Sequence, residues 1–238
     1  MLGRKMKLPL RVPGDPRLYA FARVLLVGVV RGYGRFSAQG AGELPAAGPA
    51  IVVANHPSDV DPILLGVSFP RTLHFMADVV QFRRGFVGPV IRRLAAFPID
   101  KGSPDRRSLE TALALLRRGE VVALFPEGDL YRQAEPEPFG PGIGFLAARS
   151  EAPVIPVCLT GAERIWDGQR LHWPRVTLRA GPALRFDGAP RPHGESGSGG
   201  GPAPDEREQG RRGREAYVRF AEKTRAAVLE LRNGGPGR

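Results

Sequence analysis

The sequence has 238 residues, of which 42% are hydrophobic and 25% are charged. These values are typical of a globular protein and exclude a wholly disordered or collagen-like chain, despite 31 glycines and 24 prolines. A single cysteine, Cys158, excludes an intramolecular disulfide framework and any cysteine-rich zinc cluster.

The net charge of +11 is concentrated at the two ends of the chain. Residues 1–35 carry eight basic side chains and one acidic side chain, whereas residues 36–189 are nearly neutral. A basic arm beside a neutral domain indicates attraction to an anionic surface, either a lipid headgroup layer or nucleic acid. Composition alone does not separate these two partners.

Residues 1–40 are predicted to form a basic amphipathic segment at a membrane interface, with lipid rather than nucleic acid as the partner. The longest apolar run, Val24 to Val30, has seven residues. It is far shorter than the ~20 residues that a membrane-spanning helix needs. An amphipathic helix packed on the domain explains the pattern about as well, although four aromatic residues between positions 19 and 36 favour the interface.

Short apolar runs alternate with helical patterns between residues 41 and 190, which predicts a single α/β domain with a mostly parallel or mixed sheet flanked by helices. The expected strands are Ala50 to Ala54, Thr72 to Met76, Ala95 to Ile99, Val121 to Phe125, Pro153 to Leu159 and Arg175 to Ala180. The clearest helix begins at Ser103-Pro104 and ends before Gly119.

Two further segments have simpler interpretations. Gly142 to Ala147 fits a dinucleotide-binding spacing but follows a loop instead of a strand, which predicts a loop-to-helix junction without a cofactor. Residues 191–214 contain few apolar side chains and are predicted to form a flexible linker. Residues 215–233 then show helical spacing and are expected to form a C-terminal helix.

The sequence Asn55-His56-Pro57-Ser58-Asp59-Val60-Asp61 follows the first expected strand of this domain, at an edge where open α/β sheets bind ligands. Asp61 is the fifth residue after His56, so a turn into a helix would let the carboxylate accept the imidazole N–H. The other ring nitrogen could then take a proton from a hydroxyl. An alternative is that Ser58, Asp59 and Asp61 cap a helix and His56 is a loop residue.

Three other segments overlap expected strands and offer candidate functional residues. Phe125-Pro126-Glu127-Gly128 offers a carboxylate that could bind substrate hydroxyls, although a simple turn also explains its proline and glycine. Phe97 to Gly102 offers the cation Lys101, and Ala152 to Val157 is a buried strand that could shape a wall.

In this order and spacing, the four blocks resemble the glycerolipid acyltransferase family, and specifically its 1-acylglycerol-3-phosphate acyltransferases. NHPSDVD resembles the family's His-x4-Asp block, and FPID with its following lysine resembles the second block. FPEG and APVIPV resemble the third and fourth. The resemblance extends from about Ala41 to Gly161.

The resemblance implies transfer of a fatty acyl group from acyl-coenzyme A or acyl carrier protein to a lysophospholipid hydroxyl, without a cofactor or a metal. It implies that His56 is the general base and that Asp61 orients it. Lys101, Glu127, Gly128 and Arg132 would bind the acceptor, and Cys158 would be a core residue. It also implies a peripheral membrane protein on the cytoplasmic face of the cell membrane.

The third block departs from the family pattern, because Asp129-Leu130 stands where threonine and arginine are usual. Asp129 would repel an acceptor phosphate, which leaves a non-phosphorylated acceptor as an alternative. A second alternative is a non-catalytic protein that binds a membrane surface through its basic ends.

Overall fold

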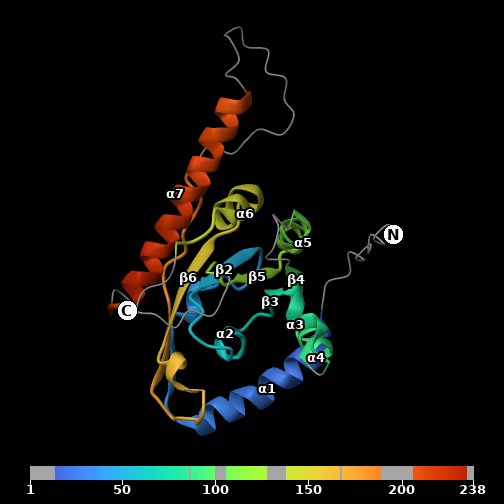
Figure 1. Ribbon diagram of the computed structural model, residues 1–238, viewed down its shortest axis with the longest axis vertical. Coiled ribbons are helices and arrows are strands. Elements are labelled where there is room, and N and C mark those ends of the chain that lie inside the picture. The colour runs from blue at the N-terminus through green and yellow to red at the C-terminus, as the bar shows by residue number, and fades with distance from the viewer. Residues whose placement is uncertain are drawn as a thin grey trace.

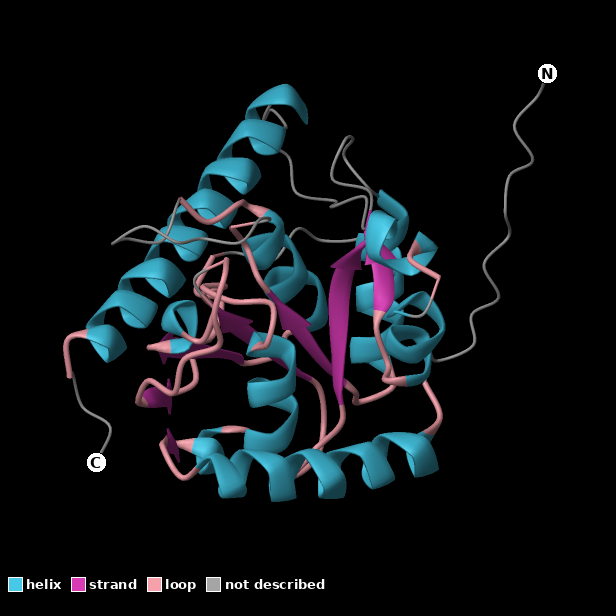
Figure 2. Ribbon diagram, turned by 60° about the horizontal axis from the view of Figure 1, so that its bottom comes forward, coloured by secondary structure: helices cyan, strands magenta, loops and turns pink. Residues whose placement is uncertain are grey.

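The computed structural model describes residues 14–85, 87–99, 106–127, 138–166, 168–188 and 206–234. Seven strands form one sheet in the order β1-β7-β6-β2-β5-β3-β4, with helices on both faces (Figures 1 and 2). The strands are β1 (Phe36–Gln39), β2 (Ala50–Ala54), β3 (Leu73–Asp78), β4 (Phe97–Ile99), β5 (Val121–Leu124), β6 (Val154–Thr160) and β7 (Val176–Ala180). The expected α/β sheet is confirmed, and it is mixed because β6 and β7 are antiparallel.

Seven α-helices are described around this sheet. They are α1 (Pro16–Tyr33), α2 (Asp61–Ser68), α3 (Val79–Arg83), α4 (Val87–Arg93), α5 (Arg106–Arg117), α6 (Gly142–Ser150) and α7 (Glu206–Arg232). Two short 3-10 turns, η1 (Ala41–Glu43) and η2 (Ala162–Arg164), follow β1 and β6. Within the described part of the chain, none of the helices is both long enough and apolar enough to cross a bilayer.

The hydrophobic core has two layers, one on each face of the sheet, and the central strand β2 contributes to both. All five of its residues are buried, and alternate side chains enter opposite layers. Val52 belongs to the layer beneath α1 and α2, whereas Ile51 and Val53 belong to the layer beneath α5, α6 and α7. A strand buried on both faces has no polar positions, which is why its apolar run was visible in the sequence.

Two elements differ from the sequence predictions. The edge strand β1 lies within residues 1–40, where only an interfacial segment was expected, and it pairs in parallel with β7. Its side chains are exposed except for the half-buried Phe36, so no apolar pattern indicates a strand. The helix α7 begins at Glu206, inside the expected linker; its first turns contain Glu, Arg and Gln, which favour a helix without an apolar pattern that would indicate one.

The helix α5 ends as expected, with Gly119 in the left-handed conformation at φ +78°. Its expected start at Ser103-Pro104 lies outside the described residues. The loop-to-helix junction expected near Gly142 is present as the start of α6.

Candidate functional site

The site begins where β2 ends. The Asn55 side chain is buried and bridges to β6, donating from Nδ2 to the Leu159 carbonyl at 2.9 Å and accepting the Leu159 N–H at 2.7 Å. The β2–β6 ladder stops at the pair Ala54 and Val157, so this side chain extends the pairing beyond the last strand residue. Asn55 thereby holds the backbone on which His56 stands, a role that the sequence alone did not reveal.

His56 and Asp61 are in direct contact. The imidazole Nδ1 lies 2.9 Å from Asp61 Oδ2, and the same oxygen accepts the Ser58 N–H at 2.7 Å. Because an ionised carboxylate only accepts hydrogen bonds, Nδ1 carries the proton and Nε2 keeps its lone pair. The five-residue spacing produces this contact because α2 begins at Asp61, directly after the turn that contains His56.

Asp61 and His56 differ in how far their side chains are buried. The Asp61 side chain is 0% exposed, whereas the His56 side chain is 18% exposed. Desolvation raises the pKa of Asp61 above its usual value, and the hydrogen bonds from His56 and Ser58 oppose that rise. The site therefore contains a costly buried carboxylate whose compensation depends on the imidazole.

An aromatic ring covers one face of the imidazole. Phe125 stacks on His56 with 4.1 Å between ring centroids and 18° between ring planes, and Phe75 stacks behind Phe125 at 6.1 Å. The stack fixes the plane of the His56 ring, and the negative face of an aromatic ring attracts an imidazolium. Sequence analysis assigned no role to Phe125, although it directly precedes the Pro-Glu-Gly turn at the end of β5.

Glu127 lies beside the histidine loop. Its Oε2 accepts the backbone N–H of His56 at 3.1 Å, which ties the end of β5 to the end of β2. The family resemblance predicts acceptor binding for Glu127, and the structure adds this contact with the loop that carries His56. Lys101, Gly128 and Arg132 lie outside the described residues.

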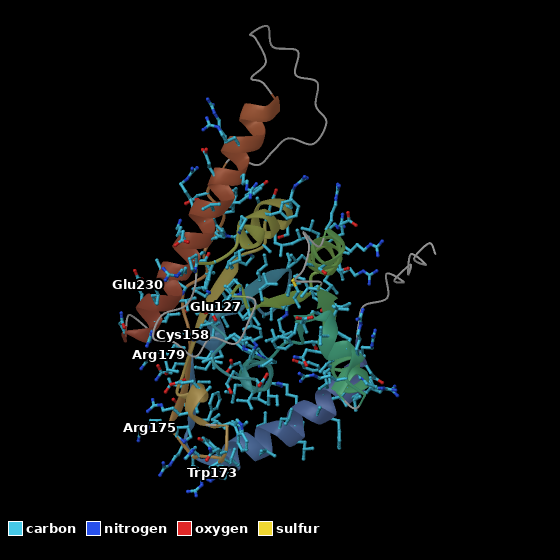
Figure 3. All side chains as sticks on the ribbon, viewed as in Figure 1. Glu127, Cys158, Trp173, Arg175, Arg179 and Glu230 are labelled. Atoms are coloured by element: carbon cyan, nitrogen blue, oxygen red, sulfur yellow. The ribbon has the colours of Figure 1, made fainter. Side chains whose placement is uncertain are left out.

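Figure 3 labels Cys158, which lies in β6, and Glu127, which follows β5; β2 lies between these two strands in the sheet. Burial raises the pKa of the Cys158 thiol to about 12, and the charges of Arg232 and Arg179 only partly oppose this rise. A thiol with such a pKa does not supply a nucleophilic thiolate near neutral pH. Cys158 is packed in the core beside Phe220 and Leu231 of α7, and it is not placed as a nucleophile.

The arrangement is suited to removing a proton from a hydroxyl. Nε2 is free to accept, Asp61 stabilises the positive charge that develops on the ring, and Phe125 holds the ring in place. Among the described residues, no group of three or more histidine, cysteine, aspartate or glutamate side chains is placed to hold a metal ion.

Comparison with known proteins places this geometry in context. The family model described as "Acyltransferase" matches residues 35–160, which include His56, Asp61, Phe125 and Glu127. A 1-acyl-sn-glycerol-3-phosphate acyltransferase of Bacillus subtilis (strain 168) is 34% identical over 119 residues, covering 50% of this chain and 59% of that protein. The chloroplastic enzyme BAT2 of Brassica napus, with the same activity name, is 28% identical over 130 residues, covering 53% of this chain and 38% of that protein.

A solved structure shares the fold. The 1-acyl-sn-glycerophosphate (LPA) acyltransferase PlsC of Thermotoga maritima superposes with a TM-score of 0.59, covering 90% of this chain and 82% of that one. The two sequences are 21% identical, so this likeness concerns the fold. The matched region spans less than two thirds of the Bacillus and Brassica relatives.

Proposed function

Because the chain belongs to the Acyltransferase family, we propose that it transfers a fatty acyl group from a thioester to the free hydroxyl of a lysophospholipid. The acceptor is 1-acylglycerol-3-phosphate and the product is phosphatidic acid, as the names of its relatives suggest. The donor is acyl-coenzyme A or acyl carrier protein. The observation that carries the proposal is the 2.9 Å contact between His56 Nδ1 and Asp61, which leaves Nε2 as a base.

The reaction proceeds by direct attack. Nε2 of His56 takes the proton of the acceptor hydroxyl while the hydroxyl oxygen attacks the thioester carbonyl carbon. Asp61 and the Phe125 face stabilise the imidazolium that forms. When the tetrahedral intermediate collapses, the carbon–sulfur bond breaks and the leaving thiolate takes the proton from Nε2. The histidine returns to its starting state with no covalent acyl-enzyme.

Acceptor binding is assigned by family resemblance. Lys101 and Arg132 would contact the acceptor phosphate, with Glu127 and Gly128 beside them. Asp129 opposes a phosphate at this place, so acylation of a non-phosphorylated acceptor is the competing outcome. The experiment below separates the two.

The protein acts at the cytoplasmic face of the cell membrane, bound to an anionic lipid surface. One side of α1 packs on the domain: the Tyr19 hydroxyl accepts the Leu73 N–H at 3.3 Å, and Arg23 donates to the Gly66 carbonyl at 3.2 Å. The other side presents Phe21 and Val24, which are 68% and 74% exposed. An exposed apolar stripe flanked by arginines supports contact with a lipid interface.

The decisive experiment measures thiol release from acyl-coenzyme A with detergent-dispersed 1-acylglycerol-3-phosphate, for the native chain and for His56→Ala. We expect acceptor-dependent release that falls by about a thousandfold or more in the variant, because the base is lost. Equal release with an uncharged lysolipid or acylglycerol would show that phosphate is not selected. An absence of release with both coenzyme A and carrier-protein donors would contradict the enzyme and favour a membrane-binding protein without catalysis.

A further inference from the structure

The segment between β6 and β7 contains a hairpin, called hairpin 165–174, which the structure describes over residues 165–166 and 168–174. Its two arms are joined by an antiparallel bridge between Trp166 and Leu171 and by a hydrogen bond from the His172 N–H to the Ile165 carbonyl at 2.8 Å. Three large apolar side chains on it face solvent: Trp166 is 49% exposed, Leu171 59% and Trp173 58%. The chain contains two tryptophans, and both lie on this hairpin.

The hairpin stands at the same edge of the sheet as His56. The register pairs Ala54, at the end of β2, with Val157 of β6, and β6 continues to Thr160 before the hairpin begins. His56 also follows the end of β2. Both segments therefore leave the sheet at the carboxyl ends of neighbouring parallel strands.

The hairpin contacts the C-terminal end of α1. The rings of Tyr33 and Trp173 have centroids 5.0 Å apart, and the Tyr33 hydroxyl donates to the Pro174 carbonyl. Arg35 donates to the Trp173 carbonyl at 2.9 Å. Figure 3 shows Trp173 and Arg175 beside the C-terminal end of α1. Trp173 thus packs against the end of the helix that carries the exposed apolar stripe.

Basic side chains are frequent in the hairpin and in the segments that adjoin it in the chain or in space. The sequence of the C-terminal end of α1 and of residues 163–175 contains two acidic residues, Glu163 and Asp167, whereas these two segments carry five exposed arginines: Arg31, Arg35, Arg164, Arg170 and Arg175. Tryptophan is enriched at the interface between the hydrocarbon core and the headgroups of a membrane, and arginine binds lipid phosphates. Exposed tryptophans among arginines therefore fit an anionic bilayer.

We propose that hairpin 165–174 is a second membrane anchor, which inserts Trp166 and Trp173 among the headgroups of an anionic phospholipid bilayer. Together with α1 it turns the carboxyl edge of the sheet, and with it His56, toward the lipid. Binding to the bilayer would bring His56 close to the lipid acceptor, and this consequence of the anchor rests on the proposed function. Binding of the hairpin to lipid can be measured without turnover.

Tryptophan fluorescence tests the anchor directly, because both tryptophans lie in the hairpin. The full chain carrying His56→Ala is titrated with vesicles of phosphatidylglycerol and phosphatidylcholine, some with brominated acyl chains. We expect a blue-shifted emission and quenching by the brominated lipid, weaker on pure phosphatidylcholine vesicles. The variants Trp166→Phe and Trp173→Phe each leave one tryptophan and report the depth of the other.

Binding without an emission change would overturn the proposal, since α1 alone would then hold the protein on vesicles. A blue shift that rises with protein concentration without lipid would also overturn it and identify a second copy as the occupant. The proposal would also be overturned if the protein failed to sediment with either kind of vesicle. Trp166→Ala and Trp173→Ala are each expected to weaken vesicle partition by about tenfold, whereas Val218→Ala, on the exposed surface of α7, is expected to leave it unchanged.

The anchor and the proposed function fail in different ways. Thiol release from vesicle-bound acceptor by the double variant Trp166→Ala/Trp173→Ala should fall with the loss of partition, while release with a short-chain, monomeric acceptor stays native. Quenching by brominated lipid without any thiol release in the native chain would contradict the proposed function and support the anchor. Thiol release without quenching would contradict the anchor alone.

Discussion

The imidazole of His56 is held by groups from two distant parts of the chain. Asp61 hydrogen-bonds its Nδ1 from the start of α2, and Phe125 stacks on its face from the end of β5. Its backbone N–H is bound by Glu127. Each contact restricts a different freedom of the ring, so the direction of Nε2 is determined before any substrate binds.

In the proposed reaction Asp61 stabilises the imidazolium, and its burial lowers the stability of the folded chain. Burial raises its pKa, so the folded chain binds the Asp61 proton more tightly than the unfolded chain does. The contribution of this group to the free energy of unfolding therefore falls as the pH rises from 3.8 through the raised pKa, and the full cost applies above it. At neutral pH the ionised carboxylate is retained for its effect on His56.

We therefore expect Asp61→Asn to separate activity from stability. Thiol release should fall by about a thousandfold or more, because the amide favours the wrong tautomer and carries no charge to stabilise the imidazolium. The free energy of unfolding at pH 7, measured by urea denaturation, should be unchanged within about 1 kcal/mol or higher, because the desolvation cost is removed.

The matched control for this prediction is Asp59→Asn, which changes an exposed carboxylate of the same loop. It should keep thiol release near the native rate. An Asp61→Asn protein that retained activity within tenfold of native would contradict the role assigned to the carboxylate.

Packing between α6 and α7 explains a glycine whose spacing resembled a dinucleotide motif. A Cβ built on Gly144 would lie 2.5 Å from both Cα and O of Tyr217, so the two helices touch at backbone distance. A Cβ on Gly142 would meet nothing nearer than a Leu109 methyl group at 4.0 Å. The structure therefore accounts for Gly144 by helix packing, with no need for a bound nucleotide.

Gly144→Ala should therefore displace α7 and lower the free energy of unfolding by about 2–4 kcal/mol. Gly142→Ala is the matched substitution and should change it by less than about 1 kcal/mol. Urea denaturation of both variants beside the native chain measures the difference. Equal stability of the two variants would show that the helices do not approach this closely.

The sheet as a whole brings together segments that are far apart in sequence. The strands β5 and β6 flank β2, so Phe125, Glu127 and Leu159 reach the loop that carries His56. The sequence predicts that these strands end at one edge, because parallel strands place their carboxyl ends together. The apolar runs of β2, β5 and β6 are continuous, and all three strands were predicted.

Other contacts were not predictable from the sequence. The Asn55 bridge to Leu159 and the Phe125 stack depend on which strand lies beside β2 and in what register, and no local pattern encodes either. The edge strand β1 was missed because an exposed strand needs no apolar periodicity. The hairpin tryptophans carry no periodic signal, and only their exposure in the folded chain distinguishes them from core residues.

A buried histidine contributes to the pH dependence of global stability, with the opposite sign to Asp61. His74 of β3 is buried beside Glu120, with Nε2 3.5 Å from the carboxylate. Burial lowers the pKa of His74 below 6.5, and Glu120 opposes this only in part. The unfolded chain therefore binds the His74 proton more tightly, and the free energy of unfolding falls as the pH is lowered from about 6.5 toward the lowered pKa.

Urea denaturation between pH 5 and 7 should therefore show a loss of stability that depends on His74, of about 1 kcal/mol per pH unit at most within that window. His74→Gln should flatten this dependence, because the amide does not titrate. His172→Gln changes a histidine on the exposed hairpin and should leave the slope as in the native chain. Glu120→Gln should steepen it, since removing the carboxylate lowers the pKa of His74 further. Identical slopes for the native chain and His74→Gln would show that the acid sensitivity of the fold lies in other groups.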